Sequence, residues 1–256
     1  MLMKNRVIPI VVLSLVILGL TGFQDKVSHS EKTGTLKISF INTVKGKPVG
    51  LRLTEHKNPF DETYTVSKFK YYISNIGIAF NDGMYSELDS YHLIDEGKPE
   101  SLSFSFRVFE NDYHSISFML GVDSIRNVSG AQTGALDPLN DMFWTWNTGY
   151  IMAKMEANSP QSKVVNKKVE YHIGGFSGVN NVLKKLTLNF PSGTSVKIKE
   201  GQTSEIIIEA DLDTWWQGPN DLKIAEHPVC STPGALARKF ADNYSRMFTI
   251  KQVINN

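Results

Sequence analysis

Apolar and polar residues alternate along most of the chain in short runs. In the first run, Leu36, Ile38 and Phe40 occupy every second position, which is the pattern of a strand with one buried face. Similar runs, separated by turn residues, cover 49–53, 69–80, 91–94, 102–108, 113–120, 150–155, 169–173, 186–190, 196–198 and 205–210. Many short strands with frequent turns predict a sandwich or a barrel. We expect an all-β, immunoglobulin-like β-sandwich with long loops.

One helix is predicted near the C-terminus, followed by a last strand. Thr232 can cap this helix, and Pro233 suits its first position. The helical stripe consists of Leu236, Phe240, Tyr244, Met247 and Phe248. The final run, 248–254, has the pattern of a strand.

The N-terminal residues have the features of an export signal. Lys4 and Arg6 precede an apolar run over 7–20, and small residues follow this run. Residues 19–22 are similar to the sequence before the lipidated cysteine of bacterial lipoproteins, but Phe23 stands in the place of the cysteine. We expect a Sec-type signal peptide at 1–22, a linker at 23–34 and one sandwich domain at 35–256. The protein would be periplasmic or attached to the cell envelope, and the alternative to cleavage is an uncleaved N-terminal anchor.

Composition and motifs exclude several classes of function. The 256 residues include 27 Lys and Arg and 26 Asp and Glu, so a basic surface for nucleic acid is not expected. The single cysteine, Cys230, leaves no intrachain disulfide. The chain has no glycine-rich phosphate loop, nucleophile elbow or HExxH motif, so nucleotide chemistry is not expected and no motif marks a catalytic site. A hydrolase with an unmarked serine is the enzymatic alternative. We also expect a monomer with no membrane span after the signal.

A long loop interrupts the strands between Leu120 and Glu156 and ends in the aromatic run 142–146. Loops of this length in a compact domain are usually functional or disordered, and disordered segments are poor in aromatic residues. On an extended chain Trp144 and Trp146 project from the same face. These two side chains would either plug one end of the sandwich or form an aromatic face that binds a carbohydrate or a protein.

Three histidines each follow a tyrosine on a predicted strand. His92, His114 and His172 would therefore point away from the face that their tyrosines occupy. Imidazole nitrogen is a favoured ligand of copper, zinc and nickel, so converging histidines would make a metal site. The alternative for each is a half-buried histidine held by hydrogen bonds. His227 and Cys230 form another candidate ligand pair.

Four segments form a central block, LGVD at 120–123, LDP at 136–138, MFWTWNTGY at 142–150 and KME at 154–156. Flanking segments are YYISNI at 71–76, YHIG at 171–174 and NYSRMF at 243–248. Together these segments resemble the signature of the MbnP family, the methanobactin-associated periplasmic proteins of Gram-negative bacteria.

The resemblance implies an exported copper-binding β-sandwich without catalytic activity of its own. In such proteins copper is held by histidine nitrogens and by a tryptophan that a partner dihaem peroxidase of the MauG type oxidises to kynurenine. On this chain His172 is the best-matched histidine, and His92 and His114 are further candidates. Trp144 or Trp146 would be the oxidised residue. We therefore expect a copper-binding protein for storage, delivery or scavenging of the metal.

Overall fold

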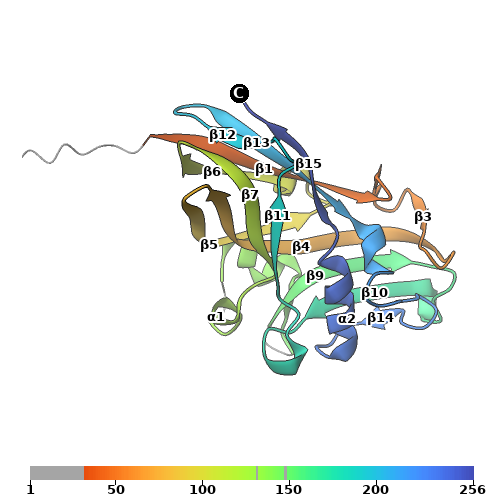
Figure 1. The fold of residues 1–256 in the computed structure, drawn as a ribbon. Helices are drawn as coiled ribbons and strands as arrows, with labels where there is room; N and C mark the ends of the chain where they lie inside the picture. The colour runs from red at the N-terminus through yellow and green to blue at the C-terminus, as the bar shows by residue number, and fades with distance from the viewer. Residues whose placement is uncertain (1–31, 131, 147–148) are drawn as a thin grey trace, which may run out of the picture. The chain divides into compact units, whose positions relative to one another are not determined.

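The described residues form two β-sheets (Figure 1). The computed structural model describes residues 32–130, 132–146 and 149–256, so the predicted signal peptide at 1–22 and most of the predicted linker lie outside the described residues. The first sheet has the order β15-β13-β1-β2. Strand β6 also pairs with β1, on the edge that does not pair with β13. Its strands are β1 (Thr33–Val44), β2 (Lys47–Pro48), β6 (Ser103–Phe109), β13 (Thr203–Asp211) and β15 (Phe248–Ile254).

The second sheet has the order β11-β7-β4-β9-β10-β14, with β3, β5, β8 and β12 attached to this path. The long strand β4 (Thr63–Phe80) organises it: β9 pairs with the first half of β4, β7 with the second half, and β5 lies along the opposite edge of the second half. The other bounds are β3 (Glu55–Lys57), β5 (Gly83–Asp95), β7 (Asn111–Leu120), β8 (Phe143–Trp144), β9 (Gly149–Asn158), β10 (Lys168–Gly174), β11 (Lys184–Asn189), β12 (Val196–Ile198) and β14 (Val229–Cys230).

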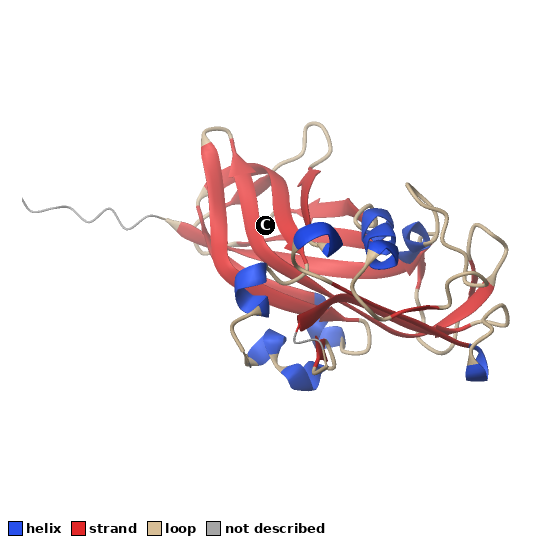
Figure 2. Cartoon of the chain, turned by 90° about the horizontal axis from the view of Figure 1, so that it is seen from below, coloured by secondary structure: helices blue, strands red, loops and turns tan. Residues whose placement is uncertain are grey.

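Aromatic side chains join the two sheets in one core. Phe40 of β1 contacts Tyr71 of β4 with ring centroids 6.0 Å apart, and Phe248 of β15 contacts Phe118 of β7 at 5.2 Å. The residues on the inner face of β1 are buried in alternation, as the hydrophobic pattern predicted. The all-β sandwich is therefore confirmed, and Figure 2 shows strands as the main component of the fold. β1 begins at Thr33 instead of at residue 35, because Thr33 already pairs with Phe109.

The predicted C-terminal helix is present as α2 (Ala235–Tyr244), but its start was predicted too early. Gly234 is the N-cap residue and no side chain caps the helix, so Thr232 and Pro233 lie outside it. Phe248 is also outside the helix and starts β15, which confirms the predicted last strand. In its described residues, the long predicted loop contains one α-helical turn, α1 (Ser124–Asn127), and two short 3-10 helices.

Short 3-10 helices lie in the connections at Pro99–Leu102, Gly134–Leu136, Pro138–Asn140, Val165–Lys167, Gly178–Asn180 and Leu212–Trp215. Within the described part of the chain, no helix has the length and apolar character needed to cross a membrane.

Candidate metal centre

His172 lies on β10, with its imidazole on the face of the strand opposite the core. Its neighbour Tyr171 is fully buried, so the predicted alternation of tyrosine and histidine is confirmed here. The imidazole Nε2 lies 3.0 Å from Oε1 of Glu156, which is on the adjacent strand β9. His172 is half-buried, and a carboxylate already holds one of its ring nitrogens. Metal-binding histidines are commonly held in this way.

Glu170 completes a group of three potential ligands with His172 and Glu156. It precedes His172 by two residues on β10, and it pairs directly across the ladder with Glu156. Because cross-strand partners and residues two apart share a face, the three side chains point the same way. One ligand atom from each lies within 4.8 Å of the others, and among the described residues no other His, Cys, Asp or Glu side chains form such a group of three.

The Glu156 carboxylate of this group is charged at neutral pH. The hydrogen bond from His172 and the positive charge of Lys68 lower the pKa of Glu156 to about 2, although partial burial acts in the opposite direction. Lys68 Nζ lies 3.4 Å from Glu156 Oε1, and Lys168 contacts Glu170. A bound metal cation would therefore compete with two ammonium groups for these oxygens.

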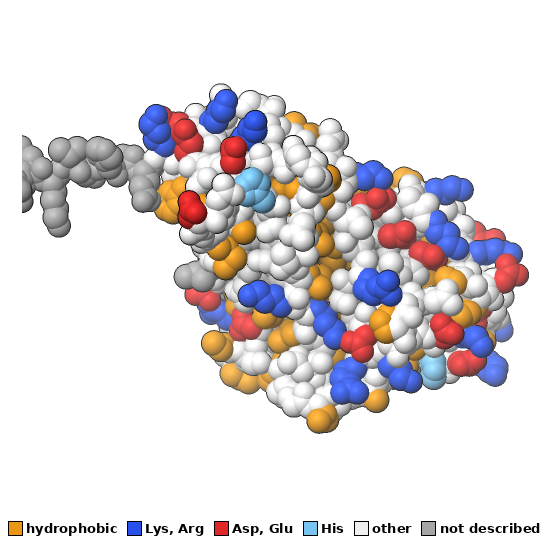
Figure 3. Space-filling model, in the orientation of Figure 1, with side chains coloured by type: hydrophobic (Ala, Val, Ile, Leu, Met, Phe, Trp, Pro, Cys, Tyr) orange, Lys and Arg blue, Asp and Glu red, His pale blue; other side chains and the backbone are white. Residues whose placement is uncertain are grey.

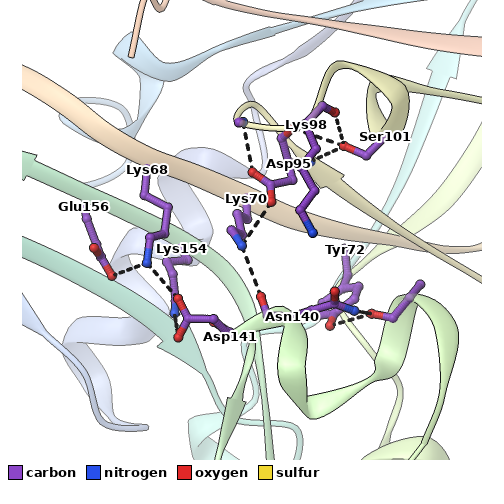
Figure 4. A network of polar contacts seen from close by, with 12 residues as sticks. Lys68, Lys70, Tyr72, Asp95, Lys98, Ser101, Asn140, Asp141, Lys154 and Glu156 are labelled. Carbon is purple, nitrogen blue, oxygen red and sulfur yellow. Dashed lines mark hydrogen bonds and ion pairs between the residues drawn. The ribbon is translucent and has the colours of Figure 1, made fainter. Parts of the chain in front are cut away.

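A network of lysines and carboxylates continues from Glu156 across the sheet (Figure 4). Lys154 pairs with His172 in the β9–β10 ladder and is 1% exposed, and its ammonium lies 3.0 Å from Asp141 Oδ1. Lys68 binds the other oxygen of Asp141 at 2.7 Å. The two lysines hold the pKa of Asp141 at about 2, despite the opposing effect of its partial burial. The network therefore ties the loop before β8 to the sheet beside His172.

The structure does not bring His92 or His114 into this group. His92 on β5 stacks on Phe104 with ring centroids 3.5 Å apart, and its Nε2 lies 3.5 Å from Glu87 Oε2. His114 on β7 is exposed. Strand order explains the separation, since β5 and β7 flank the second half of β4, whereas β10 lies beyond β9 on its first half. The expected convergence of the three histidines is thus corrected, while ligation by His92 or His114 at other places stays a prediction.

The pair of His227 and Cys230 has little capacity to bind a metal. Cys230 is a free, buried cysteine, and burial raises the pKa of its thiol to about 12. The thiolate is the form that ligates metals, so a metal at Cys230 would have to displace a proton that burial favours.

Trp144 and Trp146 are in contact but differ in exposure. Their ring centroids are 5.5 Å apart, yet Trp144 is 5% exposed and Trp146 is 62% exposed. The reason is that β8 ends at Trp144, so the strand alternation does not extend to Trp146. The two rings therefore do not form one open aromatic face.

The ring of Trp144 lies on the backbone of Gly174, two residues after His172 on β10. A Cβ atom at position 174 would lie 2.5 Å from this ring, so only glycine permits the contact. A cavity of 270 Å³ adjoins Trp144, and its lining includes Tyr150, Phe176 and Pro233. Trp144, unlike Trp146, is thus packed against the strand that carries the candidate ligand.

Sequence reasoning missed the two carboxylate partners of His172. The signal for Glu170 was available, because a residue two positions before His172 on a strand shares its face. Glu156 could be found only after β9 was known to pair with β10.

Comparison with known proteins gives one family and one fold. The MbnP family model matches residues 33–232. Among solved structures, the chain is similar to MbnP from Methylosinus trichosporium with a TM-score of 0.51 and 14% sequence identity. The likeness covers 87% of this chain and 99% of the other. No curated protein matches the sequence.

Proposed function

This chain belongs to the MbnP family, and from that premise we propose that it is an exported copper-binding protein with His172 as a metal ligand. Family membership supports a copper-related role outside the cytoplasm. The observation that carries the assignment of the site is the group formed by His172, Glu156 and Glu170. The proposal includes storage, delivery or scavenging of copper and assigns no catalytic role to the chain.

The donor atoms of this group fit oxidised copper better than reduced copper. Imidazole nitrogen and carboxylate oxygen suit Cu(II), whereas Cu(I) prefers the soft sulfur of cysteine and methionine. The group itself contains no sulfur, and Cys230 is buried as a thiol. Glu156 needs no deprotonation to bind the cation, because its pKa is about 2. Copper would supply a positive charge that replaces Lys68 and Lys168 as the partner of the two carboxylates.

A matched pair of histidine variants tests this site. We expect one equivalent of Cu(II) to bind the purified protein, and His172→Ala to weaken binding by at least about tenfold, because a metal loses a nitrogen ligand. His114→Ala is the control, since His114 is exposed and outside the group. Competition titration gives the affinities, and electron paramagnetic resonance reports nitrogen coordination. Absence of Cu(II) binding, or equal losses in the two variants, would refute the proposal.

Oxidation of a tryptophan to kynurenine is a second part of the proposal, and it requires a partner oxidase such as a dihaem peroxidase. Trp144 is the better candidate, because its ring packs on Gly174 of β10, which is two residues from His172 in sequence. Intact-mass analysis of protein from its native host, followed by peptide mapping, identifies the modified residue. Unmodified Trp144 and Trp146 in copper-loaded native protein would contradict this part and leave the His172 site to its own test.

A binding module for a carbohydrate or a protein is the second candidate function. The exposure of Trp146 at 62% is the observation that favours it, since an exposed indole can stack on a partner. Binding to a glycan array or to envelope proteins that is lost in Trp146→Ala and kept in His172→Ala would favour this role over copper binding.

A further inference from the structure

A second concave site lies on the other side of the lysine network from His172. It is a cavity of 330 Å³, and the cationic residues that line it are Arg52, Lys68, Lys70 and Lys98. We call it the basic pocket. The only carboxylate in its lining is Asp95. Its volume is near the lower end of the range for small-molecule sites, roughly 300–1,000 Å³.

Two of the four positive charges in the basic pocket are already balanced. Lys70 Nζ lies 3.0 Å from Asp95 Oδ2, and Lys68 pairs with Asp141 and Glu156. Within the described residues, Arg52 and Lys98 take part in no ion pair. The pocket therefore has an excess of about two positive charges in a protein whose net charge is +1.

Asp95 and Lys70 make the pocket a built site, in contrast to a chance group of surface lysines. Both residues are buried, and Figure 4 shows their contact on the sheet. Asp95 also accepts a hydrogen bond from the Gly97 amide at 2.9 Å, and its backbone oxygen accepts one from the Lys98 amide at 2.8 Å. Asp95 thus shapes the turn that carries Lys98.

Lys70 has hydrogen-bonding capacity left for a ligand. An ammonium group carries three N–H donors. Among the described residues, Lys70 has two acceptors, Asp95 Oδ2 and the backbone oxygen of Asn140 at 3.1 Å. The third N–H donor of Lys70 is therefore available to a ligand, and Lys70 is a buried cation that lines the pocket.

The backbone around the pocket departs from regular geometry at two points. The register of β4 against β9 shifts between Val66 and Lys68, and this bulge lets the adjacent residues Ser67 and Lys68 both line the pocket. Bulges often re-aim side chains beside binding sites. Arg52 has φ of 63°, a conformation that non-glycine residues rarely adopt, and its amide is bonded to the Val66 oxygen at 2.7 Å.

We propose that the basic pocket binds a small dianion, either a dicarboxylate or a phosphate, between the side chains of Arg52 and Lys98 and above the ammonium of Lys70. Arginine and lysine form charge-assisted hydrogen bonds with such oxygens, and two uncompensated cations match two negative charges. The site is distinct from the proposed copper site, because none of its lining residues belongs to the group of His172, Glu156 and Glu170, although Lys68 contacts Glu156.

Isothermal titration with sodium phosphate and with succinate, at constant ionic strength in chloride, tests this site on the full chain. We expect saturable one-to-one binding of at least one of the two anions. Arg52→Ala with Lys98→Ala should weaken it by at least about tenfold, as expected for the loss of charge-assisted hydrogen bonds. The control is Lys163→Ala with Lys185→Ala, which removes the same charge from two exposed positions outside the pocket and should change the affinity by less than about twofold.

Both double variants change exposed side chains, so their thermal unfolding should match that of the parent protein. Preferential binding of phosphate or of succinate identifies which dianion the pocket takes, and either result supports the proposal. Failure of both anions to saturate, or equal weakening in the pocket and control variants, overturns it. Saturable shifts of the Gly97 and Lys98 amide resonances give a second readout that places the anion at the turn.

Discussion

At the scale of single residues, Glu156 has the largest influence on the candidate metal centre. It binds His172 directly, it contacts Lys68, and its pKa of about 2 keeps it charged over the whole physiological range. The same interactions that keep Glu156 ionised also stabilise the fold. A carboxyl group whose pKa is lower in the folded protein than in the unfolded chain stabilises the folded state at any pH above its unfolded pKa.

The substitution Glu156→Gln tests this contribution. Above pH 4.5, the ordinary pKa of the group, we expect the variant to lose about 2 kcal/mol of unfolding free energy. The loss should shrink as the pH falls from 4.5 to about 2, because over this interval the carboxyl of the unfolded parent chain takes up a proton that the folded protein does not. Denaturant unfolding at several pH values measures it. Glu200→Gln, at an exposed carboxylate, is the control and should show no pH-dependent loss. A loss that does not vary with pH would contradict the role of this carboxylate.

At the scale of elements, a buried carboxylate connects the start of β4 with the segment that leads to β14. Glu62 is 6% exposed and accepts hydrogen bonds from the amides of Ile224 and Ala225 at 2.7 and 2.8 Å, and from Asn58. Its neighbour Asp61 is exposed and pairs only with Lys57. Adjacent acids that look alike in the sequence therefore have different roles, since Asp61 is a solvated loop charge and Glu62 is a buried acceptor.

Glu62→Ala should lower the free energy of unfolding by about 3 kcal/mol, because two buried donors and one part-buried donor lose their acceptor. Hydrogen exchange of the Ile224 and Ala225 amides should also become faster, which separates loss of this connection from a general loss of stability. Asp61→Asn is the matched control and should leave the stability almost unchanged, because the Asp61 side chain is exposed. Unchanged exchange at both amides would show that Glu62 does not hold this segment.

At the scale of the whole molecule, charged residues of both signs are interspersed on the surface in view in Figure 3. Within this distribution, the two proposed sites meet at one lysine. Lys68 lines the basic pocket and contacts Glu156 of the candidate metal centre. Its positive charge favours an anion in the first site and disfavours a cation in the second. The two sites should therefore respond in opposite directions when this charge is removed.

Lys68→Met should strengthen Cu(II) binding by about fivefold and weaken dianion binding by a similar factor, the effect of about 1 kcal/mol from a partly exposed charge. The same titrations that measure each site give both values. Lys185→Met, which removes an exposed lysine elsewhere, should alter neither affinity. Affinities that change in the same direction would exclude the opposing electrostatic effect.

The sequence alone determined most of the strands, the last strand at 248–254 and the C-terminal helix, because these depend on local hydrophobic period. The strand predicted at 49–53 was wrong, because residues 51–53 form a turn. The sequence also determined the family, because the segments of the central signature follow one another along the chain between residues 120 and 156. It placed His172 opposite a buried tyrosine, since alternation is a property of a single strand.

Only the tertiary structure decided which strands are neighbours. Strand order separates His92 and His114 from His172 and brings Glu156 beside it, and no local pattern encodes this order. Tertiary structure likewise decided that Glu62, Lys70 and Lys154 are buried, because burial of a charge depends on partners distant in sequence. Local period thus defines each strand, while the pairing of strands far apart in the chain decides which side chains meet in a site.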